Sequence, residues 1–198
     1  MTAPARLCVT RHGETDWNAA GILQGWLNVI LNERGRQQSR ELAAAFATAG
    51  FTRLYTSPLV RSRESADIIG GALGLLPAIQ HDGLKERHFG MIQGIPKDEL
   101  AAFNPALLRE IIRRNPACVF DGGESMEAFA RRVEDAIVDI GNRESGERVL
   151  IITHGWVMDV INRVVRGLPV STILHAKPKN GESIWLDVVD GKIVGAPS

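Results

Sequence analysis

The sequence predicts an α/β protein, a three-layer α/β/α sandwich with a mostly parallel central sheet. Short apolar runs, typical of buried strands, alternate along the chain with longer segments whose apolar residues recur at helical spacing. Hydrophobic residues make up 44% of the chain, the ordinary proportion for a globular protein. With 198 residues and no linker or internal repeat, residues 1–198 are expected to form a single domain.

The first half of the chain alternates strands with helices. Residues 35–49 carry apolar side chains at helical spacing, and Gly50 is a suitable stop. Pro58 is expected at the first position of the next helix, where its missing N–H costs nothing. Residues 21–32 mix Gly, Trp and Asn and are expected to be a loop. The expected strands cover 7–10, 53–56 and 78–80, and the expected helices cover 35–49 and 57–73.

The second half continues the alternation and ends in a hairpin. Residues 97–114 are expected to be helical with a break near Pro105, because the residue before proline avoids the α conformation. Asp190-Gly191 is a typical hairpin turn. An irregular stretch is expected at 84–94, helices at 125–140 and 157–166, and strands at 149–153, 183–189 and 193–194.

Composition excludes several classes of protein. Lysine plus arginine equals aspartate plus glutamate, 23 against 23, so no bulk positive charge favours nucleic acid. Cys8 and Cys118 match neither a disulfide framework nor a metal-ligand spacing. The first residues lack the apolar run of a signal peptide, and no apolar stretch is long enough for a bilayer. A cytoplasmic protein without membrane or nucleic-acid partners is expected.

The most informative segment is Arg11-His12-Gly13, which follows the first apolar run. Ligands of open α/β sheets bind at the carboxyl ends of strands. Arginine offers a planar fork of donors for phosphate oxygens, and histidine can act as a nucleophile. A lone histidine there is more often a buried or capping residue. A second pair, His154-Gly155, also follows an apolar run, which favours one shared anion site.

Two further residues are candidates for the same site. Arg61 lies at the start of a helix, where positive charge opposes the helix dipole, and an anion nearby would explain it. The alternative is an ordinary surface arginine. Glu86 lies in a loop, where most glutamates are merely solvated. Beside a phosphate, the pKa of its carboxyl would rise, and it could serve as a general acid.

Together these motifs resemble the histidine phosphatase superfamily, also called phosphoglycerate mutase-like. The resemblance covers nearly the whole chain, in the family's order, and the combination is far more specific than any single motif. It rests on residues 11–15, on Ser57-Pro58-Leu59 with Arg61, on Leu84 with Glu86 and Gly90, on Gly123-Glu124-Ser125, and on His154-Gly155.

The resemblance implies a role for each motif residue. His12 would be the nucleophile that forms a phosphohistidine, and Arg11, Arg61 and His154 would clamp the transferred phosphoryl group. Glu86 would protonate the leaving oxygen and then activate water or a second alcohol. No metal would be required, because the arginines stabilise the charge. Further contacts to substrate or phosphate are expected from Thr15, Asn18, Gln24, Gly25 and Gly155.

The choice between phosphatase and mutase depends on the middle of the chain. Lys97 and the pair Arg113-Arg114 are similar to the substrate-contacting residues of cofactor-dependent phosphoglycerate mutases, although a solvated helix end would explain the pair equally well. Mutases are longer after that pair, and they carry an asparagine where this chain has Trp156. A shorter lid excludes water less well, which favours a phosphatase.

We therefore expect a phosphatase of small phosphorylated metabolites, such as sugar phosphates or phosphoglycerates, that needs no cofactor. A phosphoglycerate mutase dependent on 2,3-bisphosphoglycerate is the alternative. A phosphate-binding module without activity is the third interpretation. An exposed edge strand near the C-terminal hairpin would also allow a homodimer.

Overall fold

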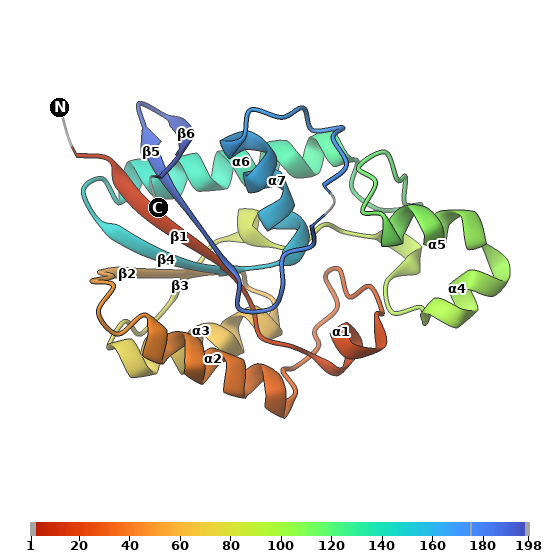
Figure 1. Cartoon of the computed structure of the whole chain (residues 1–198), viewed down its shortest axis with the longest axis horizontal. Coiled ribbons are helices and arrows are strands. Elements are labelled where there is room, and N and C mark those ends of the chain that lie inside the picture. Colours follow the sequence, from red (N-terminus) through yellow and green to blue (C-terminus); the bar gives the residue numbers. More distant parts are fainter. Residues whose placement is uncertain (1–2, 175, 197–198) are drawn as a thin grey trace.

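A computed structural model of the chain describes residues 3–174 and 176–196 and confirms the mostly parallel central sheet (Figure 1). The six strands lie in the order β3-β2-β4-β1-β5-β6. Neighbours among β1 to β4 are parallel, whereas β5 and β6 are antiparallel. Their bounds are β1 (Ala5–Arg11), β2 (Arg53–Thr56), β3 (Ile79–Gln80), β4 (Arg148–Thr153), β5 (Ser183–Val189) and β6 (Lys192–Gly195).

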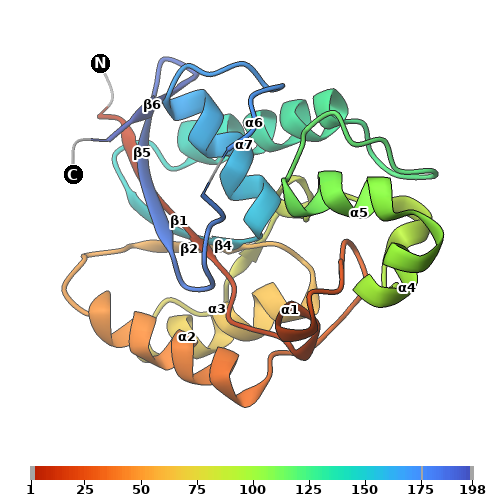
Figure 2. The same cartoon turned by 45° about the vertical axis from the view of Figure 1, so that its right-hand side comes forward.

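Helices cover both faces of the sheet and thus complete the expected three layers. In Figures 1 and 2, α2 and α3 lie on one face, α6 and α7 on the other, and α1, α4 and α5 gather at one end. The α-helices are α1 (Asp16–Ala20), α2 (Glu33–Ala45), α3 (Val60–Leu73), α4 (Lys97–Phe103), α5 (Pro105–Ile112), α6 (Met126–Arg143) and α7 (Gly155–Val165). Two short 3₁₀ turns, Asp82–Leu84 and Gly90–Ile92, flank the loop of Glu86.

The alternation of side chains along the strands builds a core on each face. In β1, Cys8 belongs to the cluster on the side of α2 and α3, while Leu7 and Val9 belong to the cluster on the side of α6. In β4, Leu150 and Ile151 divide in the same way. Because successive side chains of a strand point to opposite faces, these continuous apolar runs serve two cores at once. The sheet is therefore held rigidly, and so is the edge where its strands end.

The expected elements agree with the structure, apart from shifts of a residue or two at their ends, except at three places. The helix expected at 35–49 is α2, which ends at Ala45 with the cap Phe46 and not at Gly50. Pro58 is not the first residue of a helix: Leu59 still has extended backbone, and α3 begins at Val60. The backbone stays extended because the Ser57 N–H still bonds to the Ile152 carbonyl of β4, at 3.1 Å. The sequence analysis also missed the short helix α1, which is closed by a capping box between Thr15 and Asn18.

Several other expectations are confirmed. The second expected strand has the bounds of β2, and the break near Pro105 separates α4 from α5. Asp190 and Gly191 both have positive φ, as the tight turn between β5 and β6 requires. Within residues 3–174 and 176–196, no helix combines the length and the apolar character needed to cross a membrane.

Candidate active site

The two His-Gly pairs follow neighbouring strands and so lie together. β1 and β4 are parallel partners, with Arg11 opposite Thr153. The pairing continues one residue further, since the His12 N–H donates to the Thr153 carbonyl at 2.9 Å. Both histidines are buried, and their ring centroids are 5.1 Å apart. The expected convergence of the two sequence-distant motifs is therefore what the sheet order produces.

The hydrogen bonds of His12 fix its tautomer. Its Nδ1 lies 2.7 Å from the Gly13 carbonyl oxygen, which can only accept, so Nδ1 carries the proton. Nε2 keeps its lone pair and accepts from Arg61 Nε at 3.2 Å. Burial, followed by the charges of Arg61 and Arg11, lowers the pKa of His12 well below 6.5. At neutral pH, the ring of His12 is thus uncharged, and the lone pair on Nε2 can act as a nucleophile.

A serine orients the second histidine. His154 Nε2 lies 2.8 Å from Ser57 Oγ, which also accepts from the Leu59 N–H at 3.3 Å. With the hydroxyl proton directed at Nε2, the ring proton of His154 would lie on Nδ1. This Nδ1 is buried and has no hydrogen-bond partner among the described residues. Burial lowers the pKa of His154 well below 6.5, so the ring is neutral at neutral pH.

Two arginines supply fixed positive charge beside His12. Arg61 donates from Nη1 to the Leu27 carbonyl at 3.0 Å and from Nη2 to the Gly25 carbonyl at 2.8 Å. Arg11 donates to the Pro178 carbonyl at 2.7 Å, while its buried Nε has no partner among the described residues. Burial lowers the pKa of each guanidinium to about 10, so both remain charged at neutral pH.

Glu86 is a buried carboxyl group on the same site. Its Oε1 accepts from the Arg87 N–H at 3.0 Å, and its Oε2 accepts from the Trp156 N–H at 3.4 Å. Burial raises its pKa, while the charges of Arg114 and Arg61 oppose the rise. A carboxyl with a raised pKa is suited to exchange a proton near neutral pH.

These groups surround a small pocket, called here the inner pocket. His12, Arg11, Arg61 and Glu86 line it from three separate segments of the chain. Among the described residues, no group of three metal-ligating side chains is placed to hold an ion. The lining residues of the inner pocket are Arg11, His12, Asn18, Leu23, Gln24, Gly25, Arg61, Glu86, Phe89, Arg114, Gly155 and Trp156.

Most of the expected phosphate contacts lie on the inner pocket, but Thr15 has another task. Asn18, Gln24, Gly25 and Gly155 line the pocket. Gln24 Oε1 is buried without a hydrogen-bond partner among the described residues. The Thr15 hydroxyl instead accepts from the Asn18 N–H at 3.1 Å and caps α1, so its side chain positions Asn18.

The inner pocket adjoins a second hollow, called here the outer chamber. Arg11, Asn18, Arg114 and Trp156 line both. Lys97, which the sequence analysis placed at the substrate, lines the outer chamber together with Lys177. The full lining is Arg11, Glu14, Asn18, Gly21, Leu23, Lys97, Ile111, Ile112, Arg114, Trp156, Lys177 and Asn180.

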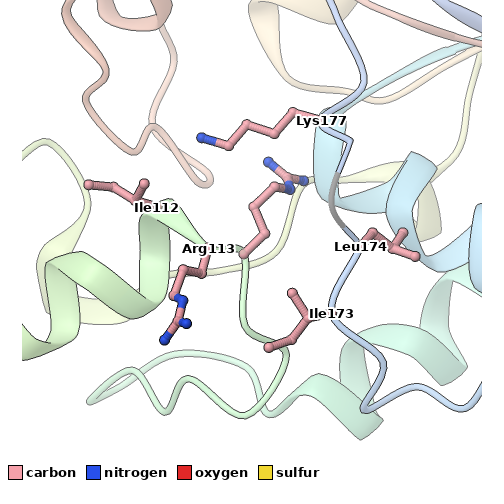
Figure 3. Close-up of a pocket in the computed structure, with 6 residues that line it drawn as sticks. Ile112, Arg113, Ile173, Leu174 and Lys177 are labelled. Carbon is pink, nitrogen blue, oxygen red and sulfur yellow. The ribbon is translucent and has the colours of Figure 1, made fainter.

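The structure separates the pair Arg113-Arg114. Arg114 has a positive φ of 53°, and its side chain lies over the Trp156 ring, 4.6 Å from the centroid. Arg113 is exposed and pairs with Glu110 at 3.5 Å. In Figure 3, its guanidinium points away from the amine of Lys177. Of the two arginines, only Arg114 therefore lies on the two hollows beside His12.

Sequence reasoning missed four residues of the site. Ser57 orients His154, and Asp159 is a buried carboxylate that accepts from Arg114 Nε. Lys177 and Asn180 come from the segment before β5, which pairs with β1; Asn180 Nδ2 donates to the His12 carbonyl at 2.8 Å. Asp159 did leave a signal, because it is an acid on the apolar face of α7.

Known proteins match this chain over most of its length. The family profile "Histidine phosphatase superfamily (branch 1)" matches residues 7–195. Phosphoglycerate mutase-like protein 4 of Arabidopsis thaliana is 36% identical over 78% of this chain and 68% of its own length. Metal-independent phosphoserine phosphatase of the same plant is 34% identical over 86% and 73%. The solved structure of Bacillus stearothermophilus YhfR superposes with a TM-score of 0.87 at 30% identity, covering 97% of this chain and 95% of that chain.

Proposed function

The chain belongs to the histidine phosphatase superfamily, and on this premise we propose that it is a metal-independent phosphatase of small phosphorylated metabolites. The observation that carries the proposal is the state of His12. Its ring is neutral, Nδ1–H is held by the Gly13 carbonyl, and the lone pair of Nε2 faces the Arg61 guanidinium. This is an imidazole prepared for attack on phosphorus.

In the first step, Nε2 of His12 attacks phosphorus and the ester P–O bond breaks. Glu86, whose pKa burial raises, acts as the general acid and delivers a proton to the leaving alcohol oxygen. Arg61 Nε, released from His12, then donates to a phosphoryl oxygen, and Arg11 Nε and His154 Nδ1 have no competing partner among the described residues. The product is His12 phosphorylated on Nε2, a phosphoimidazolium whose Nδ1–H remains hydrogen-bonded to the Gly13 carbonyl.

In the second step, water attacks the phosphohistidine. The Glu86 carboxylate takes a proton from the water, the P–N bond breaks, and inorganic phosphate leaves. His12 regains its lone pair, and Glu86 is protonated again. Charge on the transferred group is met by Arg11 and Arg61, so no metal ion enters the mechanism. The name of the metal-independent phosphoserine phosphatase from Arabidopsis supports this part of the proposal.

Mutase activity is the second candidate, favoured by the cationic outer chamber and by the mutase-like relative. The two functions differ in the acceptor of the phosphoryl group. Phosphate release from 3-phosphoglycerate without 2,3-bisphosphoglycerate identifies a phosphatase. Conversion of 3-phosphoglycerate to 2-phosphoglycerate that depends on that bisphosphate identifies a mutase. We prefer the phosphatase because this chain has the bulky ring of Trp156 at the position where mutases carry an asparagine.

Trapping the intermediate tests the shared chemistry. The wild type mixed with a radiolabelled phosphate ester should yield acid-labile, base-stable label on the protein. His12→Ala should lose both this label and turnover while keeping its circular dichroism spectrum. His81→Ala is the matched control, because His81 pairs with Asp139 away from the inner pocket. Full activity in His12→Ala would refute the mechanism.

We further propose that the protein works in the cytoplasm and forms a homodimer through an exposed edge strand. The free thiols Cys8 and Cys118 suit a reducing compartment. β3 and β6 are the edges of the sheet. Sedimentation of the purified protein tests the dimer.

A further inference from the structure

The carboxyl of Glu86 is carried by a segment without regular structure. Residues 85–89 lie between two 3₁₀ turns and belong to no helix or strand. The Glu86 carboxyl nevertheless has to stay aimed at the leaving oxygen, and a displacement of about 1 Å would already cost much of its effect. An irregular segment keeps one conformation where other groups bind its backbone N–H and carbonyl groups. The groups that bind this segment therefore bear on catalysis.

Arg132 of α6 binds the backbone of the Glu86 segment with a single guanidinium. Its Nη1 donates to the Gly83 carbonyl at 2.9 Å and to the Lys85 carbonyl at 3.0 Å, and its Nη2 donates to the Glu86 carbonyl at 3.2 Å. Its Nε and Nη2 also donate to the two carboxylate oxygens of Glu124, at 2.9 and 2.8 Å. All five N–H donors of the guanidinium are thus used, which fixes the orientation of its plane.

Glu124 binds the same segment on the other side of Glu86. Its Oε2 accepts from the His88 N–H at 2.8 Å, and its own backbone N–H donates to the His88 carbonyl at 2.9 Å. The motif Gly123-Glu124-Ser125 is not part of the described lining of the inner pocket, and its glutamate takes no part in the two chemical steps. The ion pair of Arg132 and Glu124 therefore holds the backbone both before and after Glu86.

The Glu86 carbonyl also links this ion pair to the phosphate-binding side of the site. Besides the bond from Arg132, it accepts from Trp26 Nε1 at 2.7 Å. Trp26 follows Gly25, whose carbonyl accepts from Arg61. The general acid and the arginine beside the nucleophile are thus connected through one hydrogen-bonded network, which sets the distance between them.

Resting on the proposed function, we propose that Arg132, together with Glu124, positions the general acid Glu86. Arg132 is not among the described residues that line the inner pocket, so it acts through Glu86 and does not touch the substrate. A lysine at this position would keep the positive charge, but its single nitrogen cannot bind three carbonyl groups and a carboxylate together. Arg132→Lys therefore changes the geometry of the segment while it keeps the charge of the ion pair.

Two esters that differ in their leaving group test the positioning role. The alcohol of glycerol 3-phosphate needs a proton to leave, whereas the p-nitrophenolate of p-nitrophenyl phosphate leaves without one. Arg132→Lys should lower kcat/KM roughly thirtyfold for the first ester and at most about threefold for the second. A merely structural role would lower both values equally, and that result would overturn the proposal. Arg131→Lys, an exposed neighbour on α6, is the control and should change neither value.

A double substitution shows whether Arg132 acts through Glu86. Glu86→Gln removes the acid, and it should lower kcat/KM for glycerol 3-phosphate more than for p-nitrophenyl phosphate. Adding Arg132→Lys to Glu86→Gln should then lower the value for glycerol 3-phosphate no further, because the group to be positioned is gone. The same thirtyfold loss in both backgrounds would overturn the proposal.

The pKa of Glu86 gives a measurement that needs no turnover. Burial raises this pKa in the folded protein, so a segment that moves towards water should let it fall towards the ordinary value for glutamate. Carbon-13 NMR of the carboxyl, assigned by its absence in Glu86→Gln, should show this fall in Arg132→Lys but not in Arg131→Lys. If the wild type releases no phosphate from either ester while the pKa falls as expected, the proposed function fails and the positioning role stands. An unchanged pKa in Arg132→Lys overturns the positioning role.

Discussion

At the scale of single residues, the site depends on two buried histidines kept neutral by their surroundings. Burial lowers the pKa of both His12 and His154 well below 6.5, and the nearby arginines add to the effect. The Gly13 carbonyl, which can only accept, places the ring proton of His12 on Nδ1 and leaves the lone pair on Nε2. The Ser57 hydroxyl holds Nε2 of His154, and when it donates there, His154 presents its Nδ1–H instead.

The lowered pKa values predict a dependence of stability on pH. Below pH 6.5 the unfolded chain binds protons at both histidines while the folded protein does not. The free energy of unfolding therefore decreases as the pH is lowered below 6.5, and above pH 6.5 the two histidines do not change it. His154→Gln should reduce the slope by up to about 1.4 kcal/mol per pH unit below pH 6. Urea denaturation in phosphate-free buffer at pH 7.5, 6 and 5 measures it.

Other buried groups also have shifted pKa values, but comparing His154→Gln with the wild type isolates the contribution of His154. The carboxyls of Glu86 and Asp159, whose pKa values burial raises, are present in both proteins. Their contribution has the opposite sign, because the folded protein then holds protons that the unfolded chain has lost. An unchanged slope in His154→Gln would mean that His154 is charged in the folded protein.

Ser57 gives a second prediction at this scale. Without its hydroxyl, the tautomer of His154 is no longer fixed, and Nδ1–H is not reliably available to the phosphoryl group. Ser57→Ala should lower kcat/KM about tenfold, the effect of one hydrogen bond to a charged group. Nitrogen-15 shifts of His154 should change with it. Ser39→Ala, a buried serine bound to Gly35 within α2, should leave both readouts unaltered.

At the scale of elements, two glycines set the position of the loop after β1 against α2. A Cβ on Gly13 would lie 2.3 Å from the Gly35 oxygen, and one on Gly35 would lie 2.1 Å from the Glu14 oxygen. These neighbours are backbone atoms, which cannot move away by a rotamer change as a flexible side chain can. The catalytic loop is therefore fixed by the start of a helix that contributes no side chain to the inner pocket.

Substituting Gly35 tests this contact. Gly35→Ala should lower the free energy of unfolding by about 1–3 kcal/mol through overpacking, and it should reduce activity because the loop of His12 must shift. Gly71→Ala in α3 is the contrasting change, since the nearest atom to its Cβ is Leu76 Cδ1 at 3.8 Å. That variant should gain about 0.5–1 kcal/mol from helix propensity. Thermal and urea denaturation compare the two.

The elements were predictable where local rules decide them. The β2 run and the hairpin turn at Asp190-Gly191 were predictable from the sequence. The start of α3 was not, because Ser57 continues its pairing with β4, a contact distant in sequence. Likewise, no local pattern distinguishes Arg113 from Arg114. The positive φ of Arg114 and its buried partner Asp159 make the difference.

At the scale of the whole molecule, the sheet order assembles the site. β1 lies between β4 and β5, so His154 and the segment with Lys177 and Asn180 flank His12 from both sides. The two His-Gly pairs could be predicted because each follows a recognisable apolar run. Ser57, Asp159 and Lys177 could not, because their roles exist only once the strands are paired.

This assembly predicts that an oxyanion stabilises the entire fold. Arg11 and Arg61 come from segments 50 positions apart in the sequence and form one site only in the folded protein. Phosphate at a hundred times its dissociation constant should add about 2.7 kcal/mol of stability. For a chain of this size, that corresponds to a rise in Tm of roughly 5–10 °C. Thermal denaturation in phosphate and in chloride at equal ionic strength measures the shift.

Two arginine substitutions show where the phosphate that raises Tm is bound. Arg11→Gln should lose most of the rise, because Arg11 contributes a buried guanidinium with an unpartnered Nε among the described residues. Arg63→Gln should keep the full rise, because Arg63 is an exposed residue of α3 outside the inner pocket. Equal loss in both variants would mean that phosphate acts on the protein's surface charge as a whole. A rise that only Arg11→Gln abolishes would place the anion beside His12, where the sheet brings its cations together.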